Sequence, residues 1–390
     1  MYRNKLADRA QFKDIVRMSE TLPTPHIIID LEMIRDYYRR MRSLCSYADI
    51  YYAVKACPLD EIVSMLYSEG SNFDIASRYE LDQVLALGVD PQRLLYGNTI
   101  KKAGDIAYFY EKGVRFFASD CEEDVRKIAA NAPASNVYFR VLLPHSDSAD
   151  WPLSRKFGCS STMVLDLIRL AKELKLNPIG VSFHVGSQQR NLEIWDQALK
   201  TTREIFDRSP VKLDFVDMGG GLPAQYSYPV DSLETYAKTI KSYIDKYFSG
   251  RKIRFVMEPG RSLVGDSGVL AATVVQTSRK DSKDNVRWVY IDAGKFNGMV
   301  ETIDESIKYS AYFPNRDENA PTGAVILAGP TCDSMDIMYE NYRMQMPLDL
   351  KAGERVYFLA AGAYTASYAS VCFNGFPPIQ THIYKKEKSL

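Results

Sequence analysis

Short apolar runs alternate with amphipathic stretches from about residue 25 to about residue 265. The short runs are rich in β-branched and aromatic residues, which is typical of strands, and the stretches between them repeat apolar positions at helical spacing. Strands that alternate with helices predict βαβ units and a parallel sheet. The predicted strands are His26–Leu31, Ile50–Val54, Asn72–Ala76, Leu94–Gly97, Arg115–Ala118, Asn136–Leu143, Ile179–His184, Leu213–Met218 and Arg254–Glu258. The predicted helices are Asp60–Glu69, Arg78–Leu87, Cys121–Ala130, Ser161–Leu174, Glu193–Arg208 and Asp231–Phe248.

The number and spacing of these units favour a closed (β/α)₈ barrel of the TIM type. About eight strand–helix units over about 250 residues is the size of such a barrel. An open, doubly wound sheet is the structural alternative, because it is built from the same strand–helix units. We therefore expect an α/β barrel domain over residues 25–265.

The texture of the chain changes after about residue 266. Clear helical periods become fewer, and the apolar runs are joined by irregular segments rich in Gly, Pro, Asn and Asp. This pattern predicts a mainly β domain, a sandwich or barrel-like fold, made of residues 266–390 together with residues 1–24. Its predicted strands are Val269–Ser278, Val286–Asp292, Ala324–Ala328 and Arg355–Ala360.

Composition and charge argue against several classes of protein. The chain has 390 residues with 49 Lys+Arg and 49 Asp+Glu, so its formal net charge of zero provides no global field for nucleic acid or anionic lipid. The first 24 residues lack the apolar core of a secretory signal, and no apolar run approaches the roughly 18 residues of a membrane span. Six scattered cysteines without a CxxC pair, and four histidines that do not cluster with them, argue against a metal site. We expect a cytoplasmic protein with reduced thiols that binds neither nucleic acid nor membrane.

Chemistry-bearing residues follow several predicted strands, and in a parallel barrel the active site lies at these strand ends. Lys55 closes the strand that begins at Ile50, where desolvation would make its amine a usable nucleophile. A lysine at this position can also simply extend to solvent. His184 and Glu258 end two later strands, and Arg261 follows Glu258 by three residues. A carboxylate followed closely by a guanidinium suits a ligand that has a cationic part and an anionic part.

Three consecutive glycines, Gly219 to Gly221, follow Asp217 and Met218. Glycines allow bare backbone N–H groups to converge on an anion, although such a run can also be only a flexible turn. A lysine, a histidine, a glycine-rich loop and a Glu/Arg pair at strand ends together form the inventory that pyridoxal 5′-phosphate requires. The lysine forms a Schiff base with this cofactor, glycines and arginine hold its phosphate, an imidazole stacks on its ring, and an acid pairs with its ring nitrogen.

Because it carries these residues within eight short stretches that occur in the same order along the chain, the protein resembles the fold-type III pyridoxal-phosphate decarboxylases of the ornithine/lysine decarboxylase group. The similarity runs from about residue 24 to about residue 378. It implies an alanine-racemase-like (β/α)₈ barrel with a C-terminal β domain, pyridoxal 5′-phosphate as cofactor, and a head-to-tail homodimer with shared active sites. The matching stretches are Tyr51–Ala56, Phe73–Ser77 with Glu80, Ser182–Ser187, Asp217–Gly221, Glu258–Arg261, Gly329–Asp333, Gly362–Tyr364 and Phe373–Phe376.

The resemblance implies a role for each matching residue around the cofactor. Lys55 would form the Schiff base, His184 would stack on the ring and take part in catalysis, and Glu258 would pair with the ring nitrogen. The residues that would bind the phosphate are Ser187, Gly220, Gly221, Arg261 and Tyr364. The residues that would support the cofactor from around it are Asp74, Glu80 and Arg140.

Two residues of the Gly329–Asp333 stretch would reach the active site of the partner subunit, as the resemblance implies. Cys332 would lie near the reacting atoms and would protonate Cα after CO₂ leaves, with Lys55 as the alternative donor. Asp333 would pair with the distal amine of a basic substrate, because burying an unpaired ammonium is very costly. Diaminopimelate decarboxylases typically have glutamate after this cysteine, so the aspartate favours a simple diamine precursor.

One position departs from the pattern of the eukaryotic ornithine decarboxylases, which carry a second aspartate before the stretch that starts at Gly329. Alignment places Tyr309 there, so we assign Tyr309 to substrate binding. The missing charge could come from Glu301, Asp304 or Asp317. Bacterial-looking relatives share the nearby stretch from residue 294 to residue 298, and some of them accept lysine as well as ornithine.

The leading hypothesis is a decarboxylase that converts L-ornithine to putrescine and CO₂, with L-lysine and cadaverine as the second pair, which would connect it to polyamine biosynthesis. One alternative is a decarboxylase of another amino acid, such as diaminopimelate or a substrate of siderophore or antibiotic assembly. Another is a catalytically silent regulatory relative that only binds the cofactor. Lys55, Cys332 and Asp333 argue against a silent relative, and Glu258 argues against a racemase, in which arginine is expected at that position.

Overall fold

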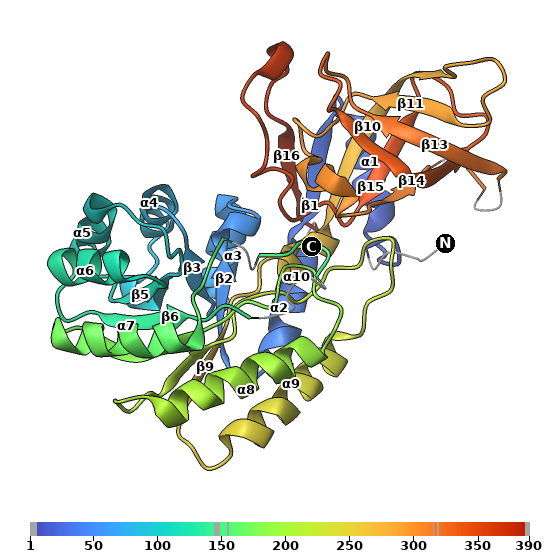
Figure 1. Ribbon diagram of the computed structural model, residues 1–390. Helices are drawn as coiled ribbons and strands as arrows, with labels where there is room; N and C mark the ends of the chain where they lie inside the picture. Colours follow the sequence, from blue (N-terminus) through green and yellow to red (C-terminus); the bar gives the residue numbers. More distant parts are fainter. Residues whose placement is uncertain (1–5, 144–148, 154–155, 315, 318–319, 387–390) are drawn as a thin grey trace. The chain divides into compact units, whose positions relative to one another are not determined.

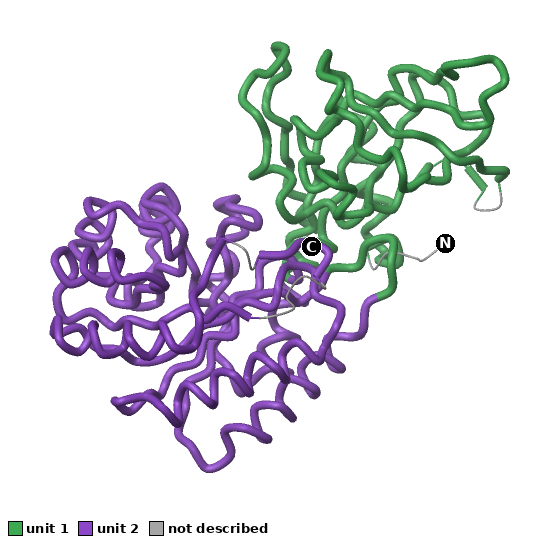
Figure 2. The backbone as a smooth tube through the Cα atoms, in the orientation of Figure 1, with its two compact units in different colours: residues 1–34, 224–229, 263–390 green, residues 35–223, 230–262 purple. Residues whose placement is uncertain are grey.

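The computed structural model describes residues 6–143, 149–153, 156–314, 316–317 and 320–386 (Figure 1). The chain forms two compact units (Figure 2). The barrel unit consists of residues 35–223 and 230–262, and the β unit consists of residues 1–34, 224–229 and 263–390. The chain therefore begins in the β unit, builds the barrel unit and returns to the β unit.

Eight parallel strands close into a barrel in the barrel unit, because the first of them, β2, pairs with the last, β9. Each strand pairs in parallel with its neighbours; on β2 and β3, for example, Tyr52 lies opposite Phe73. The predicted barrel is thereby confirmed, and the open-sheet alternative is wrong. The barrel strands are β2 (Asp49–Ala53), β3 (Asn72–Ile75), β4 (Leu94–Tyr96), β5 (Phe116–Ser119), β6 (Asn136–Arg140), β7 (Asn177–Ser182), β8 (Phe215–Asp217) and β9 (Arg254–Met257).

Helices lie between consecutive strands and surround the barrel (Figure 1). They bury one apolar face against the strands, as in α8, where Trp195, Leu199 and Ile205 are buried. Among the described residues, no helix combines the length and the apolar character needed to cross a membrane. The helices are α2 (Leu31–Leu44), α3 (Asp60–Ser68), α4 (Arg78–Ala86), α5 (Ala103–Glu111), α6 (Glu122–Asn131), α7 (Ser161–Glu173), α8 (Glu193–Arg208) and α9 (Leu233–Phe248).

Side chains fill the interior of the barrel. A buried cluster is contributed by six different strands, and its members are Tyr51, Leu95, Ala118, Tyr138, Phe215 and Val256. Aromatic pairs tie these strands together, such as Tyr138 and Phe215 with ring centroids 5.2 Å apart. A packed lumen leaves only the rim of the barrel for chemistry, and in this architecture the rim at the C-terminal ends of the strands carries it.

The β unit is built around a mostly antiparallel sheet, in agreement with the predicted second fold. Its strand order is β12-β15-β10-β11-β13-β14, and β1 pairs with both β10 and β16. The N-terminal helix α1 (Phe12–Glu20) packs onto this sheet through Phe12 and Ile15. The strands are β1 (His26–Asp30), β10 (Gly268–Ser278), β11 (Arg287–Ile291), β12 (Ser310–Tyr312), β13 (Thr322–Ala328), β14 (Ile337–Pro347), β15 (Arg355–Leu359) and β16 (Gln380–Tyr384).

The first predicted strand belongs to a different sheet from the one expected. The sequence places His26–Leu31 at the start of the barrel domain, whereas β1 pairs antiparallel with β10 and parallel with β16. All five residues of β1 are buried, so its unbroken apolar run looks like a parallel barrel strand. Periodicity reports burial and not the identity of the partner strand, which explains the difference between the predicted start at residue 25 and the observed start at residue 35.

His26 is buried in β1, and each of its two ring nitrogens takes part in a hydrogen bond. The Nδ1 atom donates to the Pro23 carbonyl at 2.8 Å, and the Ser19 hydroxyl donates to Nε2 at 2.9 Å. Burial lowers the pKa of His26, and the nearby Arg355 and His382 act in the same direction, against the Pro23 bond. The folded protein therefore resists the proton that the unfolded chain accepts below about pH 6.5.

This difference predicts that His26 costs the protein stability in mild acid. Its contribution is retained above about pH 6.5 and is lost as the pH falls from there toward the lowered folded-state pKa, by up to about 1.4 kcal/mol per pH unit. His26→Gln, which keeps a donor and an acceptor but cannot titrate, should lose less stability between about pH 7 and pH 5.5. Urea midpoints of both proteins across this range measure the effect, and parallel curves would contradict the assignment.

Candidate active site

Lys55 is anchored by a carboxylate at the rim of the barrel. It lies in the short turn that follows β2, and its Nζ donates a hydrogen bond to Asp74 Oδ2 on the neighbouring strand β3 at 2.8 Å. The Asp74 side chain is 2% exposed, whereas that of Lys55 is 48% exposed. The amine is thus held in one place by a buried charge and remains accessible to a ligand, which is the arrangement that a Schiff-base lysine needs.

The turn after β3 is fixed by a capping arrangement at the start of α4. The Ser77 hydroxyl accepts the N–H of Glu80 at 3.3 Å, and the Glu80 carboxylate accepts the N–H of Ala76 at 2.6 Å. This reciprocal pattern is that of a capping box shifted by one residue. Burial raises the pKa of Glu80, and the charge of Lys55 partly opposes that shift. Glu80 therefore shapes the backbone beside Lys55.

Two carboxyl groups approach each other beside Gly97, the residue after β4. A Cβ on Gly97 would collide with the Asp74 carboxylate and would crowd that of Glu258, so glycine is required for their approach. Burial raises the pKa of Glu258 well above its usual range, and the charge of Asp217, at the end of β8, raises it further. Within the described residues, Asp74 Oδ1 and Glu258 Oε1 are buried and have no hydrogen-bond partner. Unpaired buried oxygens next to a lysine are expected where a polar ligand belongs.

His184 follows β7 and carries a neutral imidazole. The N–H of Gly186 donates to its Nδ1 at 3.0 Å, so the ring proton is on Nε2. Burial lowers the pKa of His184 well below its usual range, and the charges of Arg140 and Lys55 add to that effect. Gly220 lies so close that a Cβ there would be 3.3 Å from Nε2. A flat, uncharged ring beside a cationic lysine is suited to stacking on an aromatic ligand.

An anion cradle is formed by the loops after β7, β8 and β9. The buried Arg261 begins the short helix α10 (Arg261–Val264), and its Nε donates to the Ser187 hydroxyl at 3.1 Å. Gly221 has φ +106°, and a Cβ there would collide with Val185. A guanidinium, a hydroxyl and exposed glycine backbone are the groups that bind phosphate in proteins. The cradle and the unpaired carboxyl oxygens together fit pyridoxal 5′-phosphate.

The barrel unit therefore collects ten of the predicted site residues at the C-terminal ends of its strands. They are Lys55, Asp74, Glu80, Arg140, His184, Ser187, Gly220, Gly221, Glu258 and Arg261. Arg140, at the end of β6, has its guanidinium 4.8 Å from the centre of the Phe157 ring. No group of three or more His, Cys, Asp or Glu side chains is placed to hold a metal ion in the part of the chain that the structure describes.

The remaining predicted site residues belong to the β unit. Tyr309 is buried, and its backbone N–H donates to the Tyr339 hydroxyl at 2.9 Å. Its ring lies edge-on to that of Tyr226, with ring centres 5.5 Å apart. Tyr364 has a left-handed backbone, with φ +55°, and its ring centre is 5.9 Å from that of Tyr368. Both positions stay predictions as contacts of substrate and phosphate.

Cys332 and Asp333 occupy a tight turn between β13 and β14. The Cys332 thiol is exposed, and the backbone N–H of Cys332 donates to Asn374 Oδ1 at 3.1 Å. Asp333 Oδ1 accepts the N–H of Met335 at 2.8 Å, and the Asp333 carbonyl accepts the N–H of Asp336 at 3.1 Å. The thiol and the carboxylate are thereby presented next to each other on a structured turn.

Asp336, which the sequence analysis did not single out, holds this turn together. Its buried carboxylate accepts the N–H of Lys295 at 2.8 Å and both the N–H and the hydroxyl of Thr331, at 3.1 and 2.8 Å. A Cβ on Gly294 or Gly329 would collide with that carboxylate. The signal in the sequence is an aspartate three residues after Asp333, but only the contacts reveal that it is buried.

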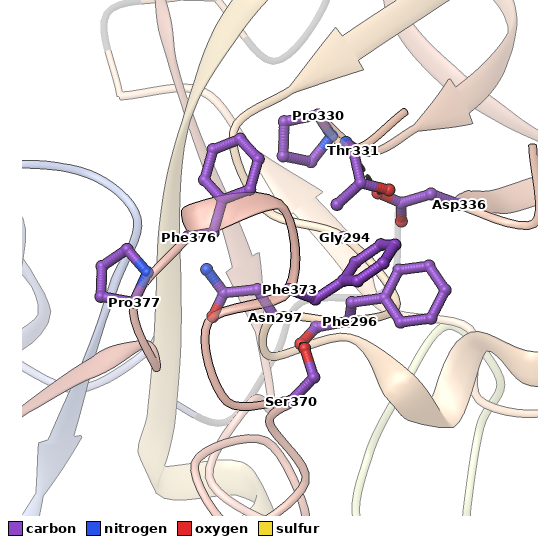
Figure 3. Close-up of a pocket in the computed structure, with 10 residues that line it drawn as sticks. All are labelled: Gly294, Phe296, Asn297, Pro330, Thr331, Asp336, Ser370, Phe373, Phe376 and Pro377. Carbon is purple, nitrogen blue, oxygen red and sulfur yellow. Dashed lines mark hydrogen bonds between the residues drawn. The ribbon is translucent and has the colours of Figure 1, made fainter. Parts of the chain in front are cut away.

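A pocket opens beside this turn (Figure 3). The rings of Phe296 and Phe373 pack against each other in its lining with ring centres 4.9 Å apart, and Thr331 and Asp336 form its polar side. The amide of Asn297 points into the same region, and its Oδ1 is buried without a hydrogen-bond partner among the described residues. The complete lining is Gly294, Phe296, Asn297, Pro330, Thr331, Asp336, Ser370, Phe373, Phe376 and Pro377.

Comparison with known proteins identifies the family of the chain. The pyridoxal binding domain of the pyridoxal-dependent decarboxylases matches residues 31–265. The ornithine decarboxylase of Schizosaccharomyces pombe is 34% identical over 338 residues, which cover 84% of this chain and 75% of that protein. The lysine/ornithine decarboxylase of Selenomonas ruminantium is 29% identical over 383 residues, which cover 97% of this chain and 94% of that protein. The solved arginine decarboxylase of Paramecium bursaria Chlorella virus, bound to agmatine, superposes with a TM-score of 0.85 at 26% identity over 95% of this chain and 100% of that chain. The chain therefore belongs to the fold-type III pyridoxal-dependent decarboxylases, and its cofactor is pyridoxal 5′-phosphate.

Proposed function

We propose that this enzyme decarboxylates a basic L-amino acid, with L-ornithine as the preferred substrate and L-lysine as the second, and releases putrescine or cadaverine. The observation that carries the proposal is the accessible Lys55 amine held by the buried Asp74 carboxylate, set beside an anion cradle and an uncharged imidazole. The three relatives named above are decarboxylases of ornithine, of lysine and ornithine, and of arginine. All of these substrates are basic amino acids, which supports a basic substrate for this enzyme.

Within this proposal, the residues at the barrel rim divide the work of binding. Arg261, Ser187 and the glycine loop would hold the phosphate, and Lys55 would carry the cofactor covalently. His184 would cover one face of the ring, and Glu258 would face its nitrogen. When bound, the cofactor withdraws the electrons that remain on Cα after CO₂ leaves. A carboxylate at the ring nitrogen favours the protonated ring, which withdraws electrons more strongly.

The turn that carries Cys332 and Asp333 would complete the site from a second subunit, so we also propose a homodimer with shared active sites. The Asp333 carboxylate would pair with the distal ammonium of the substrate. The Cys332 thiol would return a proton to Cα, with the amine of Lys55 as the alternative donor. Tyr309 and Tyr364 would contact the substrate and the phosphate. A cytoplasmic location is part of the same proposal.

A decarboxylase of another amino acid is the second candidate. The Glu305 carboxylate lies four residues before Tyr309 in the sequence. It already accepts the backbone N–H groups of Glu340, Asn341 and Tyr342 at 2.6 to 2.8 Å. Of the three acids considered as a second charge, Glu301 is buried and Asp304 is exposed on a left-handed backbone at φ +53°. No second carboxylate for the distal ammonium of ornithine is assigned by these contacts. Diaminopimelate and substrates of specialised pathways therefore remain alternative substrates in this proposal.

Substrate screening tests the proposal. CO₂ release would be measured with added pyridoxal phosphate on L-ornithine, L-lysine, L-arginine, meso-diaminopimelate and L-glutamate, with products identified by mass spectrometry. We expect release from L-ornithine above L-lysine, and little from the other three. Release only from L-arginine or diaminopimelate would keep the decarboxylase and overturn the proposed substrate.

A further inference from the structure

Gln189 is a fully buried residue beside the anion cradle that the sequence analysis did not single out. It lies in the loop after β7, two residues beyond Ser187. Its side-chain Nε2 donates a hydrogen bond to the Val185 carbonyl at 2.9 Å, and its Oε1 accepts the N–H of Asn191 at 2.9 Å. Because the amide uses a donor at one end and an acceptor at the other, it has one orientation. The side chain therefore fixes the path of the loop on both sides of its own position.

The backbone of Gln189 connects the loop after β7 to the loop after β8. Its N–H donates to the Gly221 carbonyl at 2.9 Å, and its carbonyl accepts the hydroxyl of Tyr236 on α9 at 3.0 Å. The Tyr236 ring packs edge-on against Trp195 of α8, with ring centres 5.8 Å apart. A Cβ on Gly221 would collide with Val185 and would lie 3.6 Å from Trp195. Gln189 thus links the two loops of the cradle to each other and to helix α9.

The turn that presents the Ser187 hydroxyl has an unusual backbone. Gly186 precedes Ser187 with φ +93°, and Gln188 follows it with φ +58°. A residue with a side chain is disfavoured in this left-handed region, so the surrounding contacts must hold it there. On one side, Ser187 and Trp151 exchange two backbone hydrogen bonds, at 2.9 and 3.1 Å. On the other side, the turn continues directly into Gln189. The place of the Ser187 hydroxyl in the cradle therefore depends on the bonds that anchor the two ends of the turn.

We propose that Gln189 is a positioning residue of the phosphate site, which holds the loops after β7 and β8 in the geometry that lets Ser187 and Gly221 bind the same phosphate. An apolar residue in its place would leave the buried Val185 carbonyl without this donor and would loosen the connection between the loops. Binding of the phosphate would weaken, whereas the ring and the aldehyde depend on residues after other strands. The inference rests on the proposed place of the phosphate at the cradle and is independent of the amino acid that the enzyme decarboxylates.

Two forms of the cofactor test the inference. Pyridoxal has the ring and the aldehyde of pyridoxal phosphate but lacks the phosphate, so the ratio of the two dissociation constants reports on the phosphate site. Both constants are measured on the full-length, cofactor-free protein from the absorbance of the bound aldehyde. Gln189→Met keeps the length of the side chain but loses its amide. We expect its affinity for pyridoxal phosphate to fall by about tenfold, and its affinity for pyridoxal to stay within about twofold of the wild type. Equal losses for both ligands, or no loss, would overturn the proposal.

The reference variant is Arg261→Met, which removes the guanidinium of the cradle. It should also weaken the binding of pyridoxal phosphate and not that of pyridoxal. If Arg261→Met weakened both ligands equally, the cradle would not be the phosphate site, and the role of Gln189 would fail with it. If Arg261→Met were selective and Gln189→Met were not, the phosphate site would stand and only the role of Gln189 would be overturned.

Tyr236→Phe tests the same connection if Gln189→Met does not fold. This variant removes the hydroxyl that holds the Gln189 carbonyl but keeps the ring against Trp195. We expect the affinity for pyridoxal phosphate to fall by about threefold, with that for pyridoxal unchanged. Its control is Tyr243→Phe, which removes a partly exposed hydroxyl from the same helix and should match the wild type. A Tyr236→Phe protein with the wild-type ratio of dissociation constants would overturn the proposal.

Discussion

Replacing Lys55 by alanine is expected to abolish decarboxylation, with a loss of about 10³-fold or more, because its amine is the proposed covalent attachment point. The visible absorbance of the bound cofactor should shift to that of the free aldehyde. Borohydride reduction followed by peptide mass spectrometry should label the peptide that contains Lys55 in the wild type and no peptide in the variant.

The matched variant is Lys55→Arg, which keeps a cation near Asp74 but provides no amine. We expect it to fold like the wild type and to be as inactive as the alanine variant. If Lys55→Arg retained covalent label or substantial turnover, another lysine would be the attachment point, and the ion pair with Asp74 would have only a structural role. Lys101 would then be a poor candidate, since its ammonium is fully buried in a pair with Asp124.

Asp333→Asn is the second change with a large expected effect. Removing one partner of a desolvated charge pair costs about 3–5 kcal/mol, so kcat/KM for L-ornithine should fall by between about 10²-fold and several thousand-fold. The cofactor is bound by the barrel rim, so its affinity should stay within about twofold of the wild type. Steady-state kinetics and fluorescence titration of pyridoxal phosphate measure the two quantities.

A neutral substrate analogue sharpens this prediction. L-norvaline has the chain length of L-ornithine but lacks the distal ammonium, so it has no charge for Asp333 to meet. The residual turnover of L-norvaline should differ little between the wild type and Asp333→Asn. An equal loss on both substrates would show that Asp333 supports the turn, as its bond to the N–H of Met335 allows, and does not recognise the ammonium.

Local pattern was sufficient for most of the barrel because strand and helix periods differ along the chain. The predicted strand Asn72–Ala76 is observed as Asn72–Ile75, and the predicted helix Glu193–Arg208 has the same ends in the structure. The pattern failed where the apolar face was ambiguous. Helix α2 and strand β14 were not predicted, and both mix apolar positions with many charged or polar ones.

In the candidate site, too, some residues could be predicted from the sequence and others could be found only in the structure. Lys55, His184, Glu258 and Arg261 could be found because a barrel brings strand ends together whatever the residues between them are. Asp217 was noticed only as the residue that leads into the glycines, and Asp336 was not noticed at all. Their importance comes from burial and from hydrogen bonds, and one of those that Asp336 accepts comes from Lys295, 41 positions away in the sequence.

The sequence by itself determined the alternation of strands and helices, the chemical groups at the strand ends and the family of the chain. All three depend on the order of residues within short segments. Only the tertiary structure decided that β1 joins the sheet of the β unit, that the Lys55 amine meets Asp74, and that burial raises the pKa of Glu258. The physical reason is that partner choice and desolvation are properties of packed neighbours. A run of apolar residues predicts that a strand is buried, but not against which strand, and a carboxylate acquires an unusual proton affinity only where folding removes water and brings other charges close.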